Sequence, residues 1–469
     1  MPTRVAVVGA GPGGYAAAFY AADLGMQVTL IDPEKNPGGV CLYRGCIPSK
    51  ALLHVAKVMD EARHASSWGI EFGKPAVDVE RLRGYKNRVV EKLTSGTGQV
   101  AKLRKVTYVQ GRAAIASPTR LQVTLAAGGE QNVEVDYVIL ATGSEPTRIP
   151  SLSLDSPRVI DSTGALDLPE IPRSLLVVGG GYIGLELGSV YAALGTSVSV
   201  VEMTSGLLPG ADRDLVRYLA QRVEKTFQRV MLSTKVLGIK AAGDGINVEF
   251  EGEGAPPHAT YDYVLVSIGR RPNASVPGLE ATKVQVTDRG FIQTDFQRRT
   301  DEPTIFAIGD VAGEPMLAHK ASHEARVAVE AIAGHKAIFE PLAIPAVVYT
   351  DPEIAWAGLT ETQAEKEGRK IEVARFPWGA SGRAIAIDRV DGLTKLVIDP
   401  ETERVLGVGI VGSGAGELIA EGVLAIEMGA TASDVKLTIH PHPTLTETVM
   451  EAAEQFFGTA THVYKPKRK

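Results

Sequence analysis

Residues 4–14 read RVAVVGAGPGG, and residues 174–184 read SLLVVGGGYIG. Each stretch is a run of β-branched and apolar residues that ends in the glycine pattern GxGxxG. Such a run predicts a buried strand, and the glycines predict a tight turn that opens a helix. The glycines of the two patterns are Gly9, Gly11 and Gly14, and Gly179, Gly181 and Gly184.

The similarity between the two stretches continues beyond the glycines. An alanine-rich helix follows the first turn, then a second strand that ends at Asp32; the second copy ends its second strand at Glu202. The distance from the first glycine to the acid is 23 positions in both copies, and the copies are offset by 170 residues. The sequence therefore predicts two copies of one βαβ unit.

The chemistry of dinucleotide binding explains this spacing. The first glycine makes the turn, the second lets a pyrophosphate approach the backbone, and the third lets the helix pack on the strand. The helix N-terminus then faces the anion, and the acid accepts hydrogen bonds from a ribose 2′-hydroxyl. One GxGxxG pattern alone is weak evidence for a dinucleotide site, but the full order of strand, helix, strand and acid occurs twice in this chain. We therefore expect two dinucleotide sites.

Three further apolar runs end in glycine, at residues 138–143, 264–269 and 305–310. Taken singly, each is more typical of an ordinary turn. In open α/β sheets, however, ligands bind at the carboxyl ends of parallel strands. The candidate ligand-binding residues at these three ends are Ala141, Thr142, Gly143, Gly269, Gly309 and Asp310.

Proline-rich segments suggest the domain boundaries. They divide the chain into residues 1–148, 149–272, 273–345 and 346–469. The first two regions each carry one βαβ unit, and the third contains the strand that ends at Gly309. The last region mixes strands and helices without a nucleotide signature, which favours packing or dimerisation. The predicted fold class is α/β, with two Rossmann-like domains and a C-terminal α+β domain.

Composition excludes several classes of protein. A net charge of −6 over 469 residues gives no basic field for nucleic acid, and the only basic run, at 465–469, predicts a solvated end. The longest uncharged stretch, residues 5–22, is interrupted by glycines and is not a membrane span, and no signal peptide is evident. Two cysteines exclude a disulfide scaffold, and they are too few for a structural zinc site.

Those two cysteines, Cys41 and Cys46, lie in the segment GGVCLYRGCIPSK at residues 38–50. In a regular helix, residues five apart have α-carbons about 8 to 9 Å apart, beyond the ~7 Å limit for a disulfide. A disulfide here requires a distorted turn, which Gly45 permits and Pro48 encourages. The alternative is a pair of buried free cysteines.

The segment from residue 38 to residue 53, GGVCLYRGCIPSKALL, resembles the redox-active segment of the class I pyridine nucleotide-disulfide oxidoreductases. The resemblance covers nearly the whole chain, because both GxGxxG patterns, ATG at 141–143 and TIFAIGD at 304–310 occur in the order typical of that family. MLAHKA at 316–321, YTDPEIAWAG at 349–358 and HPHPTLTE at 440–447 also match it. The resemblance implies that the first unit binds FAD, that the second binds NAD and that residues 273–345 complete the FAD domain.

The resemblance also implies roles for individual residues. Cys41 is the thiol that exchanges with substrate sulfur, and Cys46 lies against the flavin as its charge-transfer donor. Lys50 and Glu186 match an ion pair near the flavin, although Glu186 without the resemblance is more typical of an exposed charge on an amphipathic helix. Tyr182 matches a ring that covers the nicotinamide pocket; the alternative is a packed core tyrosine.

A dithiol needs a base, because only the thiolate is nucleophilic. By resemblance, His442 accepts the proton and Glu447 orients its ring, with the histidine reaching the cysteines of the opposite subunit in a homodimer. Glu447 also fits a capping box with Thr444, and its two oxygens allow both roles. His440 is the rival base.

The acid of the second unit decides the pyridine nucleotide. Glu202 repels a 2′-phosphate and no arginine follows at 203–206, which predicts NAD. By resemblance and by the absence of further cysteines, the expected activity is oxidation of protein-bound dihydrolipoamide by a cytoplasmic enzyme whose partner is a lipoyl-bearing acyltransferase or carrier protein. The alternatives are another NAD(P)H-dependent disulfide reductase of the family and a noncatalytic, NAD-sensing flavoprotein subunit.

Overall fold

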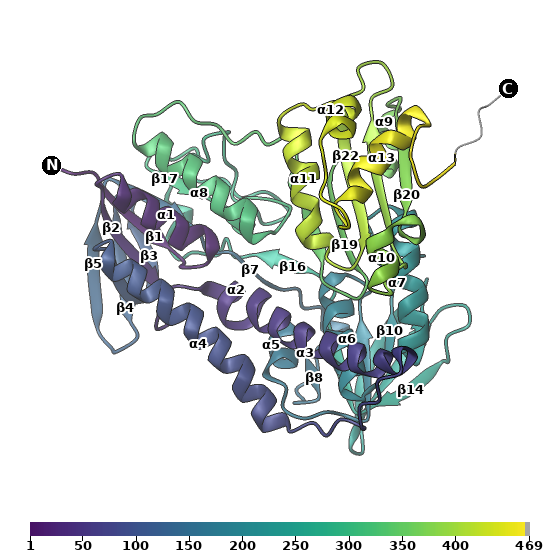
Figure 1. The fold of residues 1–469 in the computed structure, drawn as a ribbon. Helices are drawn as coiled ribbons and strands as arrows, with labels where there is room; N and C mark the ends of the chain where they lie inside the picture. Colours follow the sequence, from purple (N-terminus) through teal and green to yellow (C-terminus); the bar gives the residue numbers. More distant parts are fainter. Residues whose placement is uncertain (465–469) are drawn as a thin grey trace.

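The computed structural model describes residues 1–464, so the basic run at 465–469 lies outside the described residues. Two βαβ-containing units and an antiparallel sheet flanked by helices make up the structure (Figure 1). The α/β fold class predicted from the sequence is confirmed.

The first sheet is built around the first glycine pattern. Alternate residues of its central strand face opposite sides: Val5 and Val7 pack against helices α1 (Pro12–Asp23) and α8 (Ala318–Ile332), while Ala6 and Val8 face the other side. All four are almost fully buried. In sheet order the strands are β17 (Ile305–Ala307), β6 (Tyr137–Leu140), β1 (Arg4–Val8), β2 (Gln27–Asp32), β3 (Thr107–Ser117), β4 (Arg120–Leu125) and β5 (Glu130–Glu134).

The second glycine pattern builds a second parallel sheet in the same way. Arg4 pairs with Gln27 in the first sheet and Ser174 with Ser197 in the second, so the two units share one register. The repeat predicted from the sequence is confirmed. The strands are β11 (Arg229–Met231), β10 (Ser197–Val201), β9 (Ser174–Val178), β15 (Tyr263–Val266) and β8 (Val159–Ile160); α6 (Tyr182–Leu194) and α7 (Arg213–Thr226) belong to this unit. We call β1-α1-β2 the first dinucleotide unit, and β9-α6-β10 together with α7 the second.

The C-terminal region forms an antiparallel sheet with helices packed on it (Figure 1). Its core contains the fully buried Trp378. Its strands are β18 (Ala346–Val348), β19 (Glu353–Gly358), β22 (Val405–Gly412), β21 (Leu393–Ile398) and β20 (Glu372–Pro377). Its helices are α9 (Glu361–Glu367), α10 (Gly382–Ala386), α11 (Ala415–Glu427), α12 (Ala432–Leu437) and α13 (Glu447–Phe457).

The remaining elements connect these bodies. The helices are α2 (Gly39–Arg44), α3 (Cys46–His64), α4 (Val79–Leu103) and α5 (Ser162–Asp167), with short 3-10 turns at Ala65–Trp68, Pro150–Leu152, Leu279–Ala281, Gly309–Val311 and Trp378–Ala380. A small sheet joins β12 (Lys235–Ala242), β13 (Gly245–Glu251) and β14 (His258–Tyr261), and β7 (Ser144–Pro146) pairs with β16 (Arg270–Pro272). Among residues 1–464, no helix is long and apolar enough to span a membrane.

Candidate active site

The first glycine turn requires glycine at two of its three positions. A Cβ on Gly9, where φ is +96°, would lie 2.3 Å from the carbonyl oxygen of Ala141, and one on Gly14 would lie 1.8 Å from the carbonyl oxygen of Gly9. Gly11 differs, because a Cβ there meets no protein atom within 4 Å. Gly11 is also the N-cap of α1 and provides no side-chain partner for the free N–H groups of the helix. The turn therefore leaves open space at a helix N-terminus, which suits a pyrophosphate.

The second turn repeats this geometry. A Cβ on Gly179 would lie 2.6 Å from the carbonyl oxygen of Ser267, and one on Gly184 would lie 2.5 Å from that of Gly179. Gly181 again has nothing within 4 Å and caps α6 without a side-chain partner. The residues present therefore fit a second dinucleotide.

Both acids are buried and bind the turn of their own unit. Asp32 accepts hydrogen bonds from the backbone N–H of Ala10 (2.7 Å) and of Glu34 (2.9 Å). Glu202 accepts the equivalent pair from Gly180 (2.7 Å) and Thr204 (2.7 Å). Burial raises the pKa of Asp32, although these backbone hydrogen bonds favour its ionised form.

A cleft of about 1110 Å³ runs from the first glycine turn past the two cysteines to α6. Its length and its open glycine suit an extended dinucleotide such as FAD. Among the predicted site residues, those that line it are Gly9, Gly11, Asp32, Cys41, Cys46, Lys50, Ala141, Thr142, Gly143, Tyr182, Glu186, Gly309 and Asp310. The structure places Gly14, Gly179, Gly181, Gly184, Glu202, Gly269, His442 and Glu447 outside the lining of this cleft.

Sequence reasoning missed two polar residues that line the cleft. Ser144 donates from its Oγ to Asp310 (2.5 Å), and Arg270 donates from its Nε to the Ser144 Oγ (2.8 Å). Each of the two residues directly follows a glycine at the end of a strand, Gly143 or Gly269. This position directly after a strand-ending glycine is the feature of the sequence that could have identified both residues.

Glu324 on α8 was also missed, although it supports the turn that carries Asp310. It is fully buried, and it accepts the backbone N–H of Gly309 at 2.6 Å. Two cations, Lys320 (3.0 Å) and Arg298 (3.1 Å), satisfy its other oxygen. Glu324 lies three residues beyond the motif at 316–321, and the sequence there gave no indication of this contact.

The two cysteines lie on either side of a break between helices. Helix α2 ends at Arg44 and α3 begins at Cys46, and Gly45 between them has φ −143° and ψ −115°. The distorted turn predicted at Gly45 is confirmed. Both cysteines are thiols here, and Cys46 is exposed in the cleft, so the alternative of two buried structural cysteines is wrong.

The two thiols differ in acidity because one donates to the other. A hydrogen bond from Cys41 and the charge of Lys50 together lower the pKa of Cys46 to about 7. The same hydrogen bond, with burial, raises the pKa of Cys41. Cys46 is therefore the thiol of the pair that ionises first, and it does so around neutral pH.

Glu186 is a buried charge, which excludes the exposed-helix alternative. It is only 3% exposed, and its Oε2 lies 2.8 Å from the Nζ of Lys50 and accepts a hydrogen bond from Ser49 at 3.1 Å. Its other oxygen accepts the backbone N–H of Tyr349 at 2.9 Å. The Tyr182 side chain on the same helix lines the cleft and is 41% exposed, so it is not a core tyrosine.

The candidate base lies at the start of α13. The Nδ1 of His442 is 2.9 Å from Oε1 of Glu447, whose Oε2 accepts the backbone N–H of Thr444 at 2.8 Å. One carboxylate thus contacts the histidine and caps the turn before the helix. His442 is exposed, whereas both ring nitrogens of His440 are engaged, with Glu421 (2.6 Å) and the carbonyl of Thr438 (2.8 Å). The geometry favours His442 over His440 as the free base.

With this geometry established, comparison with known proteins defines the class. Residues 3–325 match the family described as pyridine nucleotide-disulphide oxidoreductase, and residues 344–453 match its dimerisation domain. The chain therefore belongs to the pyridine nucleotide-disulphide oxidoreductase family.

Within that family, the chain is similar over its full length to dihydrolipoyl dehydrogenases. It is 50% identical over 469 residues to the dihydrolipoyl dehydrogenase of Haemophilus influenzae, covering 100% of this chain and 98% of that protein. The corresponding enzyme of Geobacillus stearothermophilus is 44% identical over 463 residues, with 99% and 98% covered. FAD and NAD are the cofactors of these enzymes.

Solved structures agree with this assignment. LpdA from Mycobacterium tuberculosis has a TM-score of 0.89 at 27% identity, covering 96% of this chain and 99% of that one. The HOCl-induced flavoprotein disulfide reductase RclA from Escherichia coli has a TM-score of 0.85 at 26% identity, covering 97% and 99%.

Proposed function

We propose that this chain oxidises protein-bound dihydrolipoamide to lipoamide and reduces NAD⁺ to NADH. The observation that carries the proposal is the acidic Cys46 thiol, which lies with Cys41 and the Lys50–Glu186 pair in the cleft that starts at the first glycine turn. Full-length similarity to dihydrolipoyl dehydrogenases supports the substrate.

The two dinucleotide units hold the two cofactors. Gly11 would hold the pyrophosphate of FAD and Asp32 its ribose, and Ala141, Thr142, Gly143, Gly309 and Asp310 would line the rest of the FAD site in the large cleft. The second turn would hold NAD, with Glu202 binding its ribose and Tyr182 covering the nicotinamide pocket. When bound, FAD supplies a two-electron relay between the dithiol and the pyridine nucleotide.

The protein side chains move the sulfur and the first proton. Nε2 of His442 accepts a proton from one thiol of dihydrolipoamide, and Glu447 stabilises the resulting imidazolium. The substrate thiolate attacks Sγ of Cys41, the Cys41–Cys46 bond breaks, and Cys46 leaves as a thiolate. The second substrate thiol attacks the mixed disulfide and its proton passes to the departing Cys41 sulfur, which releases lipoamide and leaves the Cys41 thiol, the Cys46 thiolate and the first proton on His442. The low pKa of Cys46 makes it the better leaving group.

The active site is completed in a homodimer. His442 is exposed at the end of the matched dimerisation region and does not line the cleft of its own chain. We therefore infer that the partner subunit's His442 faces Cys41. A lipoyl-bearing acyltransferase or carrier protein presents the substrate arm, and a chain whose only two thiols are redox-active suits the cytoplasm.

Turnover by the FAD-loaded protein tests the activity. We expect NAD⁺ reduction with dihydrolipoamide and with reduced lipoyl domains, and little with NADP⁺. Efficient turnover of glutathione disulfide but not of lipoamide would instead identify another disulfide reductase of the family. A protein that binds NAD⁺ without turning over any dithiol would be the noncatalytic subunit.

Hybrid dimers test the shared site. A Cys41→Ser chain and a His442→Ala chain are each expected to be inactive as homodimers. Unfolding and refolding an equal mixture gives half hybrids with one intact site of two, hence about a quarter of wild-type activity. Hybrids without activity would show that each chain uses its own histidine.

A further inference from the structure

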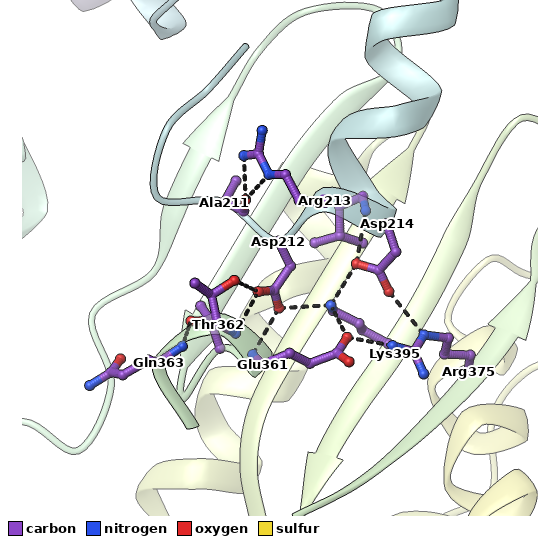
Figure 2. Close-up of polar contacts among 11 residues, drawn as sticks. Ala211, Asp212, Arg213, Asp214, Glu361, Thr362, Gln363, Arg375 and Lys395 are labelled. Atoms are coloured by element: carbon purple, nitrogen blue, oxygen red, sulfur yellow. Dashed lines mark hydrogen bonds and ion pairs between the residues drawn. The ribbon is translucent and has the colours of Figure 1, made fainter. Parts of the chain in front are cut away.

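A group of charged side chains around the buried Lys395 joins the second dinucleotide unit to the antiparallel sheet (Figure 2). Lys395 on β21 is 1% exposed. Its Nζ lies 2.7 Å from Asp212, 2.7 Å from Asp214 and 2.6 Å from Glu361. Asp212 and Asp214 stand at the start of α7, in the second unit, whereas Glu361 and Lys395 belong to the antiparallel sheet and its helix.

The chain itself satisfies these three carboxylates. Oxygen atoms of the three lie within 4.8 Å of one another, a separation that would suit a divalent cation. The Lys395 ammonium already occupies the centre, within hydrogen-bond distance of all three groups. Arg375 adds a second cation on the outer side, 2.9 Å from Asp214 and 2.5 Å from Glu361. We therefore interpret the cluster as an anchor and not as a metal site.

Asp212 has a second set of contacts that fixes it to the antiparallel sheet region. Its carboxylate accepts the backbone N–H groups of Glu361 (3.0 Å) and Thr362 (3.2 Å), at the first turn of α9. These N–H groups have no partner within their own helix. Burial alone would raise the pKa of Asp212, but Lys395 and the two N–H groups hold it below its usual value. Asp212 therefore stays ionised and held in place.

The next residue, Arg213, holds the segment before it. Its guanidinium donates to the backbone carbonyls of Leu207 (2.8 Å), Leu208 (2.6 Å) and Ala211 (3.1 Å). Figure 2 shows Arg213 pointing away from the carboxylate group and toward Ala211. Asp212 thus links the segment 203–211 to the antiparallel sheet and its helix. Arg213 holds the backbone conformation of that segment.

This segment binds the second glycine turn at both of its ends. It begins after Glu202, whose carboxylate accepts the N–H of Gly180 at 2.7 Å. Near its end, the N–H of Leu208 donates to the carbonyl of Gly180 at 2.9 Å. The carbonyl of Gly180 is therefore held by Leu208, whose own carbonyl Arg213 holds, and the N–H of Gly180 is held by Glu202, the residue directly before the segment.

We propose that Lys395 is a positioning residue for NAD: through Asp212 and Arg213 it fixes the segment 203–211, and with it Gly180 and Glu202. The inference rests on the proposed function, in which Glu202 binds the NAD ribose. The first unit is built differently, since the carbonyl of Ala10 accepts from the N–H of Gly38, the first residue of the cysteine segment.

The test measures NAD⁺ binding to the FAD-loaded protein by calorimetry, together with KM for both substrates. We expect Lys395→Met to raise the dissociation constant and the KM for NAD⁺ about fivefold, and Asp212→Asn and Arg213→Gln to raise them about twofold or more. KM for dihydrolipoamide and the FAD content should not change. Because effects that act through one segment are not independent, Lys395→Met with Arg213→Gln should weaken binding less than the product of the single effects.

A matched control separates positioning from stability. Thr394, the neighbour of Lys395 on β21, is fully buried and contacts Trp378 (3.0 Å) and Thr448 (2.8 Å). Thr394→Val should lower the melting temperature and leave NAD⁺ affinity unchanged.

Unchanged NAD⁺ affinity in Lys395→Met and Asp212→Asn would overturn the proposal. If Lys395→Met does not fold, the milder Asp212→Asn decides. If only Arg213→Gln weakens NAD⁺ binding, Arg213 positions the segment without help from Lys395 and Asp212, and the role proposed for Lys395 would be wrong. A wild-type protein that binds no NAD⁺ would contradict the proposed function itself, which is a different result.

Discussion

Glu186 holds the Lys50 ammonium at 2.8 Å, although the two residues lie 136 positions apart on different helices. Glu186 comes from α6, which follows the second glycine turn, and Lys50 comes from α3, one turn beyond Cys46. The pair therefore couples the helix of the second dinucleotide unit to the helix that begins with the redox cysteine. It also places two opposite charges near one thiol.

Those two charges should shift the acidity of Cys46 in opposite directions. Lys50 lowers the pKa of Cys46 and Glu186 raises it. We expect Lys50→Met to raise the value from about 7 by about one pH unit, and Glu186→Gln to lower it. The pH dependence of iodoacetamide alkylation of the reduced protein measures both shifts. Lys57→Met is the control, because that lysine points to Ser413 instead. If both substitutions shift the pKa of Cys46 in the same direction, the opposite effects assigned to Lys50 and Glu186 would be wrong.

The reduced thiol pair predicts a maximum in stability with pH. The folded pKa of Cys46 is about 7, below the ordinary 9.0, and that of Cys41 is raised. Between pH 7 and 9.0 the unfolded chain binds more protons than the folded one, so the free energy of unfolding rises with pH. Above 9.0 the unfolded chain loses both protons while Cys41 keeps its own, so stability falls.

Differential calorimetry from pH 6 to 10 measures this contribution. The reduced wild type is compared at each pH with a Cys41→Ser/Cys46→Ser double variant, which removes both thiols and keeps the other titrating groups. We expect the difference in melting temperature to grow from pH 7 to about 9 and then to decline. A difference that decreases steadily over this range would contradict the ordering of the two thiols.

The glycine turns give a prediction in which two neighbouring substitutions have different effects. Gly11→Ala should leave the melting temperature of the apoprotein unchanged, because its Cβ meets no protein atom, but should weaken FAD binding about tenfold or more by occupying the pyrophosphate space. Gly14→Ala should destabilise the fold by about 2 kcal/mol or more, because its Cβ would lie 1.8 Å from a carbonyl oxygen. Apoprotein melting and FAD titration separate the effects.

The second turn is the internal control for this prediction. Gly181→Ala should weaken NAD⁺ binding and leave FAD affinity as it is, since Gly181 has the same open surroundings. A loss of FAD affinity in Gly181→Ala, or of apoprotein stability in Gly11→Ala, would show that the two turns are not separate ligand sites.

The sequence was sufficient to predict those structural features that depend only on neighbouring residues. The turns, their acids and the break at Gly45 follow from backbone requirements of a few neighbouring residues, and the structure has each of them. The sequence was not sufficient to predict the burial of a side chain whose partners are distant in the chain. Lys395 lies in the strand sequence LTKLVI, where a lysine indicates a solvent-facing position, yet it is buried because carboxylates 181 and 183 positions away surround it.

The same limit explains the residues missed in the cleft. Ser144 meets Arg270, 126 positions away, and Asp310, 166 positions away. Ser144 and Arg270 each looked like an ordinary residue after a glycine, and only the pairing of β7 with β16 and the position of β17 bring them to Asp310. Burial of Glu186 depended likewise on Lys50 and Tyr349, which the helix pattern of α6 does not encode.

The contact between His442 and Glu447 predicts a large effect of Glu447 on turnover. Glu447 accepts with both oxygens, from Nδ1 of His442 and from the N–H of Thr444. In Glu447→Gln the amide oxygen can satisfy only one of these donors, and the amide NH₂ turned toward Nδ1 makes that nitrogen an acceptor. The ring proton then moves to Nε2, which can no longer accept a proton from the substrate thiol. We expect kcat to fall about 10²- to 10⁴-fold with little loss of stability.

Stopped-flow reduction of the protein by dihydrolipoamide should show the same loss, whereas reduction by NADH, which needs no base on the thiol side, should stay near the wild-type rate. Glu451→Gln, one turn along α13, is the matched control, because Glu451 pairs with His462 instead. We expect it to change stability and to leave turnover within about twofold. Equal losses in both variants would mean that the substitutions act by disturbing α13, and the role of Glu447 as the partner of the base would be wrong.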